Sequence, residues 1–161
     1  HAVQVSGPSG TLVSWQEFSR RIAFEDLPTA GAFMVFHRKR EMFAAAHNFT
    51  HFFAHESCGF CTPCRVGTQL QKRIMDKIAG GHGTPADLEE LKHVGHILGT
   101  MSHCGLGHTA ANPVLDTLKK FPGTFERKLK ALSFEPAFDL DGALQTARSI
   151  TGRDDEWAHL L

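Results

Sequence analysis

The chain has no excess of either charge and no long apolar run. Its 17 Lys and Arg balance 17 Asp and Glu, so the formal net charge is +0 with neutral histidines. Proteins that bind nucleic acid usually have a basic surplus, and the balance therefore argues against nucleic acid as the main partner. No apolar run approaches the roughly 18 residues of a membrane span. No secretory signal opens the sequence, and we expect a cytoplasmic protein.

The sequence also lacks the glycine-rich loop of a dinucleotide-binding domain. Gly7 and Gly10 do not have the G-x-G-x-x-G spacing, and no strand, glycine loop and helix follow them. We therefore expect no nucleotide site in this chain. No residue stands out as a catalytic acid, base or nucleophile, and the acidic pair Glu25 and Asp26 is typical of a solvated turn.

Cysteine is scarce, but three of the four cysteines fall in one short run. Cys58, Cys61 and Cys64 have the spacing Cys-x-x-Cys-x-x-Cys, and Cys104 comes much later. Soft thiolates select iron–sulfur clusters, zinc or Cu(I) over hard cations. A tight run of three with a remote fourth is more typical of a [4Fe–4S] cluster than of zinc, whose ligands usually come as two separated pairs.

The cysteine spacing alone leaves alternatives open. A structural zinc site would use the same four thiolates, and redox-active or inert thiols are a third interpretation. Disulfides suit small secreted domains, whereas a chain of 161 residues with 42% hydrophobic residues can build an ordinary core.

The residues between the cysteines favour a cluster. Gly59 allows close approach of the backbone and a positive φ. Thr62 and Pro63 predict a helix start, with Thr62 as the N-cap, so that the positive end of the helix faces a negative cluster. Arg65 either adds a positive charge near the site or is a solvated helix residue.

Residues 56–67 resemble the signature of the NADH-binding flavoprotein subunit of respiratory complex I. The same element occurs in the diaphorase subunit of NAD-reducing [NiFe] hydrogenases and in related NAD-dependent formate dehydrogenases. Every fixed position of the signature, Glu-Ser-Cys-Gly-x-Cys-x-Pro-Cys-Arg-x-Gly, is present. Residues 102–107 and 110–114 are similar to the segment that carries the fourth ligand of this family.

The resemblance implies one [4Fe–4S] cluster on Cys58, Cys61, Cys64 and Cys104. It also implies that FMN and NAD(H) bind elsewhere, on a flavin-binding domain or subunit, and that this chain is the C-terminal portion of a longer subunit. The implied function is transfer of single electrons between FMN and downstream iron–sulfur subunits of an NAD(H)-dependent oxidoreductase complex.

Residues 23–27 and 31–36 look more like the hydrogenase diaphorase subunit than complex I. The same module in NADH:quinone oxidoreductase or in formate dehydrogenase is the alternative. A zinc module with four cysteine ligands, which only docks partner subunits, is the alternative from another class.

We expect an α+β fold that is mainly α. The resemblance implies a partial β-grasp domain in residues 1–39, and apolar periodicity predicts an antiparallel four-helix-bundle-like iron–sulfur domain in residues 40–133. Residues 134–161 form a tail with one predicted helix near its middle. Strands are expected at residues 2–5 and, buried, at 31–36. Trp15, Phe18 and Ile22 have the spacing of core residues on a helix that begins near Ser14.

Histidines are abundant, and two positions draw attention. His47, His51 and His55 are spaced i, i+4, i+8 on a predicted helix, where a polar helix face is favoured over a metal site. His103 adjoins Cys104. If its side chain faces the cluster, a hydrogen bond to sulfur would raise the reduction potential.

Overall fold

The computed structural model describes residues 1–135 and 138–154 of the chain. It is mainly helical with one small antiparallel sheet, which confirms the α+β class. The elements are β1 (Ala2–Val5), β2 (Thr11–Ser14), the 3-10 helix η1 (Trp15–Glu17), β3 (Phe33–Phe36), α1 (Met42–Glu56), α2 (Thr62–Ala79), α3 (Pro85–Met101), α4 (Gly105–Thr109), α5 (Asn112–Lys120), α6 (Gly123–Glu126) and α7 (Leu140–Thr151).

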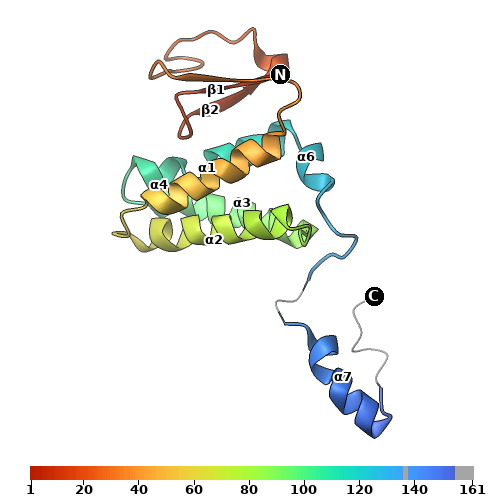
Figure 1. Cartoon of the computed structure of the whole chain (residues 1–161). Helices are drawn as coiled ribbons and strands as arrows, with labels where there is room; N and C mark the ends of the chain where they lie inside the picture. Colours follow the sequence, from red (N-terminus) through yellow and green to blue (C-terminus); the bar gives the residue numbers. More distant parts are fainter. Residues whose placement is uncertain (136–137, 155–161) are drawn as a thin grey trace.

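The sheet has the strand order β2-β1-β3, with both pairs antiparallel. It lies across α1 on the side away from α2 and α3 (Figure 1). Ala2 and Leu12 of the sheet pack on Met42 and Ala45 at the start of α1, and all four are buried. The sheet is therefore attached to the helices mainly through the first turns of α1.

Two polar side chains of α5 also attach the sheet to the helices. The amide of Leu12 in β2 donates to Asp116 Oδ2 at 2.8 Å, and the ammonium of Lys120 donates to the Leu12 carbonyl. Burial raises the pKa of Asp116, against the opposing effects of the Leu12 amide and Lys120. The Lys120 ammonium also lies 3.0 Å from Glu17 Oε2.

Two expectations for the first 40 residues are wrong. The segment after Ser14 forms a single 3-10 turn, and Trp15, Phe18 and Ile22 are more than half exposed. The strand near residues 31–36 exists as β3 but is not buried as a whole: Val35 is 77% exposed, whereas Phe36 packs on the cluster that includes Ala2 and Met42. The exposed apolar residues of both segments lack a covering layer within the described part of the chain.

The main core lies between the long helices. Phe43 of α1, Met75 of α2, Leu91 of α3 and Val114 of α5 are fully or almost fully buried in one cluster. Phe125 of α6 joins it, with its ring edge-on to the Phe43 ring at 5.0 Å between centroids. The expected helix start at Pro63 is confirmed to within a residue, and α3 and α5 likewise have a proline, Pro85 and Pro113, in their first turn.

The predicted tail helix is present as α7. None of its residues is buried, and it lies apart from the other helices (Figure 1). Among the described residues, no helix is both long enough and apolar enough to cross a membrane.

We expect Phe125→Ala to lower the free energy of unfolding by about 3–5 kcal/mol, because the change leaves a cavity in the main core. Phe24→Ala is the matched control. Phe24 is 94% exposed, so the free energy of unfolding should change by no more than about 0.5 kcal/mol. Urea unfolding followed by circular dichroism measures both. Equal losses in the two variants would contradict this assignment of the core.

Candidate iron–sulfur site

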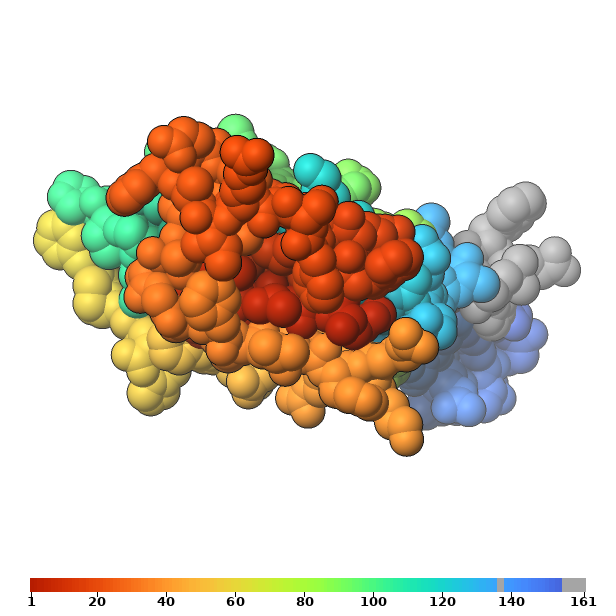
Figure 2. Space-filling model, turned by 90° about the horizontal axis from the view of Figure 1, so that it is seen from above, coloured from red at the N-terminus to blue at the C-terminus, as the bar shows by residue number. Residues whose placement is uncertain are grey.

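The four cysteines come together at one end of the helical layer. They line a pocket of about 280 Å³ between the α1–α2 loop and the start of α4. Seen from above, the segments around residues 60 and 105 form the end of the molecule away from α7 (Figure 2). The other lining residues include Ser57, Phe60, His103 and Leu106.

The conformation of the α1–α2 loop depends on Gly59 and Arg65. Gly59 has φ +79°, the left-handed region that favours glycine. The Arg65 guanidinium donates to the Gly59 carbonyl at 2.7 Å and to Thr62 Oγ1 at 3.3 Å. Arg65 therefore fixes the loop.

Helix α2 begins at the pocket. Cys61 is its N-cap, one residue before the position predicted, and Pro63 lies in the first turn, where its missing N–H costs no hydrogen bond. The Cys61 carbonyl accepts the first helical hydrogen bond, from the Arg65 amide at 2.9 Å. The positive end of α2 thus adjoins the pocket, where it stabilises negative charge.

Two of the cysteines have opposite electrostatic environments. The backbone amides of His103 and Cys64 lower the pKa of the Cys61 thiol. Burial raises the pKa of Cys64, and the other three cysteines add to this effect, while the Ser57 hydroxyl opposes it. Ser57 Oγ lies 3.3 Å from Cys64 Sγ and donates to it when the sulfur is a thiolate. Cys64 is the buried member, whereas Cys58 and Cys104 are exposed.

His103 contributes in a way that the sequence did not predict. Its backbone amide stabilises the Cys61 thiolate, and its ring packs edge-on against the Phe60 ring at 5.4 Å. Among the described residues, no hydrogen bond joins the His103 ring to a cysteine sulfur. The interaction with the thiolate therefore comes from the backbone, which any non-proline residue at this position supplies.

Gly107 brings the two cysteine loops into close contact. A Cβ atom at this position would lie 2.4 Å from Ser102 Oγ and 3.1 Å from Cys64 Cβ. The α4 backbone thus packs directly against the Cys64 side chain, which leaves no space for a larger residue.

Comparison with known proteins is consistent with this geometry. Residues 44–128 match the family described as the NADH-ubiquinone oxidoreductase-F iron-sulfur binding region, a 4Fe-4S family. The chain belongs to this family. The matched range begins in α1, ends after α6 and includes all four cysteines.

Relatives occur in two kinds of enzyme complex. The chain is 40% identical over 146 residues to the NAD-reducing hydrogenase HoxS subunit alpha of Cupriavidus necator, covering 89% of this chain and 24% of that protein. It is 38% identical over 95 residues to an NADH-quinone oxidoreductase subunit of Streptomyces coelicolor, covering 58% of this chain and 21% of that protein. A solved NAD+-reducing [NiFe]-hydrogenase in the H2-reduced state superposes with a TM-score of 0.82 at 50% identity. The match covers all of this chain and 28% of the solved one. The chain thus spans about a quarter of the length of these proteins.

We expect Gly107→Ala to lower stability by about 1–3 kcal/mol and to reduce the iron bound per chain, because the added methyl group displaces Ser102 and Cys64. Gly105→Ala is the control, since a Cβ there meets nothing within 4 Å. Thermal unfolding and iron analysis measure the two effects. Normal iron content in Gly107→Ala would show that the close contact is not needed.

We expect Ser57→Ala to lower the reduction potential of a cluster bound here without loss of iron, because a hydrogen bond to a ligating sulfur stabilises the reduced, more negative state. Redox titration followed by EPR measures the potential. The control is Thr109→Ala, whose hydroxyl bonds the Gly105 carbonyl rather than a sulfur. The same potential in Ser57→Ala and the wild type would refute this role.

Proposed function

We propose that this chain is the electron-transfer [4Fe–4S] module of an NAD(H)-linked flavoprotein subunit, most closely of the NAD-reducing hydrogenase type. The proposed ligands are Cys58, Cys61, Cys64 and Cys104. The observation that carries the proposal is the convergence of these four thiols in one pocket, inside the segment that matches the iron–sulfur family.

The order of the ligands along the chain supports a cluster over a single zinc ion. Cys58, Cys61 and Cys64 come from one short run and Cys104 from a distant loop, whereas zinc ligands usually come as two separated pairs. All four cysteines line one pocket of about 280 Å³, which leaves space for an inorganic core.

When bound, a [4Fe–4S] cluster takes up and releases one electron at a time. The chain's own residues would hold it and set its potential. The backbone amides of His103 and Cys64, which contact the Cys61 sulfur, stabilise negative charge there, and so does the N-terminus of α2. The burial of Cys64 has the opposite effect, because it disfavours added charge.

The exposed side of the pocket is where we place the flavin-binding domain or subunit. Cys58 and Cys104 are exposed there, and Phe60 is 75% exposed. An exposed aromatic ring beside exposed ligands supports a docking surface for a partner. FMN and NAD(H) would bind on that partner. Electrons would pass between the partner's flavin and the other iron–sulfur subunits of the complex through the cluster of this chain. We place the complex in the cytoplasm.

The hydrogenase type is supported by the extent of the similarity. The match to the hydrogenase subunit covers 89% of this chain, against 58% to 71% for NADH-quinone oxidoreductase subunits of several bacteria. The additional coverage extends beyond the 4Fe-4S region at residues 44–128.

We further propose three parts for the chain: a partial β-grasp domain in residues 1–39, an antiparallel four-helix-bundle-like iron–sulfur domain in residues 40–133, and a tail in residues 134–161. The exposed apolar side chains of Phe24 and Val35 support the first assignment, since such residues are normally covered in a complete domain. The shared core of α1, α2, α3 and α5 supports the second.

The test is anaerobic purification with iron and acid-labile sulfide analysis, followed by EPR after dithionite reduction. We expect about four irons and four sulfides per chain and the spectrum of a reduced cubane. Cys104→Ser should lose both. Met101→Leu, which removes an exposed thioether at the end of α3, should retain them. Bound zinc without sulfide or EPR signal, even after anaerobic reconstitution, would overturn the electron-transfer proposal.

A further inference from the structure

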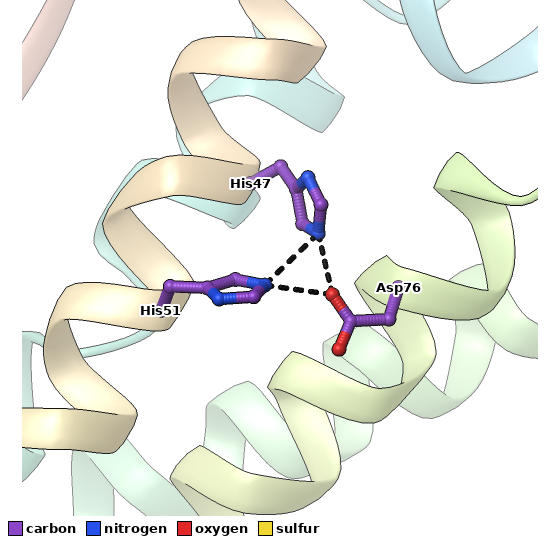
Figure 3. Close-up of side chains that lie close together, drawn as sticks. All are labelled: His47, His51 and Asp76. Carbon is purple, nitrogen blue, oxygen red and sulfur yellow. Dashed lines mark hydrogen bonds and ion pairs between the residues drawn. The ribbon is translucent and has the colours of Figure 1, made fainter.

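A second group of ligand atoms lies on the faces of α1 and α2 that meet, outside the cysteine pocket. His47 and His51 of α1 point toward Asp76 of α2 (Figure 3). His47 Nε2 and His51 Nε2 lie 2.6 and 2.7 Å from Asp76 Oδ1, and the two nitrogens lie 3.2 Å apart. The three atoms thus form a small closed triangle.

Hydrogen bonds to Oδ1 can account for two contacts of this triangle, but they leave the 3.2 Å contact between the two nitrogens without one. Lys72 Nζ holds the other carboxylate oxygen, Oδ2, at 2.7 Å. The carboxylate is thus paired with an ammonium, and its Oδ1 is an acceptor only. If both Nε2 atoms donate to it, their N–H groups converge on one oxygen and their hydrogens come close together. If one of the two Nε2 atoms carries no hydrogen, its lone pair faces the lone pairs of the carboxylate oxygen, and the two repel each other.

We propose that His47, His51 and Asp76 bind a divalent first-row transition-metal ion. Such an ion at the centre accepts all three lone pairs at once. With metal–ligand distances of about 2.0–2.2 Å, tetrahedral ligand atoms lie roughly 3.4 Å apart. The nitrogens already have nearly this separation, and Oδ1 needs to move by roughly 1 Å or less to reach it.

The donor set and the exposure define the kind of ion. Two imidazoles and one carboxylate suit Zn²⁺, Co²⁺, Ni²⁺ or Fe²⁺, whereas Mg²⁺ and Ca²⁺ require mainly oxygen ligands. The His51 side chain is 44% exposed, so the remaining coordination position opens to water. His47 is oriented by stacking on Phe43 at 5.8 Å between ring centroids, and Lys72 orients the carboxylate.

The third histidine of the row does not belong to this site. His55 lies one turn beyond His51, but its side chain is 86% exposed and its Nδ1 contacts the neighbouring Glu56 at 3.1 Å. The histidine spacing alone did not distinguish His55 from the other two. The distinction comes from Asp76 on α2, which lies close to His47 and His51.

The bound ion would join the two helices that lead into and out of the cysteine loop. α1 ends at Glu56 and α2 begins at Thr62. The triad shares no residue with the cysteine pocket, so this inference stands independently of the proposed function.

The test is calorimetric titration of Zn²⁺ into the iron-loaded chain under anaerobic conditions. The wild type should bind one more Zn²⁺ per chain than His51→Gln or Asp76→Asn, and Zn²⁺ should raise its thermal midpoint but not theirs. Mg²⁺ should not compete. His55→Gln, the matched control on the same helix, should behave as the wild type.

The difference between variants isolates the triad, because any Zn²⁺ taken up by free cysteines contributes equally to every titration. Failure of the iron–sulfur proposal would appear as missing iron in all the proteins and would not alter this difference. Equal Zn²⁺ binding by the wild type, His51→Gln and Asp76→Asn would overturn the proposal. Loss of binding in His55→Gln would also overturn it.

Discussion

The site depends on the close contact between the backbone at Gly107 and the Cys64 side chain. Cys104 is far from the other cysteines in sequence, and only the packing of α3 and α4 against α2 returns it to them. That packing needs small residues. At Gly67 in α2, a Cβ atom would lie 2.9 Å from Leu98 of α3. The geometry of the four sulfurs is therefore set by how closely backbones approach one another, as much as by the cysteines themselves.

The local backbone conformation was predictable from the sequence at residues, such as glycine and proline, whose conformational preference differs from that of all others. Gly59 adopts the positive φ that a glycine allows, and Pro63 lies in the first turn of α2. The cysteine motif was enough to name the candidate site residues. It was not enough to predict their environments, because the amide of His103 reaches Cys61 only through the tertiary fold.

The errors in the first 40 residues have one physical cause. Apolar periodicity shows which side chains share a face, but it does not show that another layer covers that face. Trp15, Phe18 and Ile22 have helical spacing, yet their segment is a turn and their side chains are exposed. The periodicity of the histidines in α1 likewise did not show which of them lie together, because the group also includes Asp76 on α2.

The two outer strands of the sheet differ in what lies beside them. The outward-facing amide and carbonyl of Leu12 in β2 are occupied by Asp116 and Lys120, so α5 closes that edge. The edge of β3 has no such cover among the described residues, and it is followed by the basic run at residues 38–40, a feature that discourages unspecific strand pairing. Any extension of this sheet, by another segment or another chain, therefore has one available direction, alongside β3.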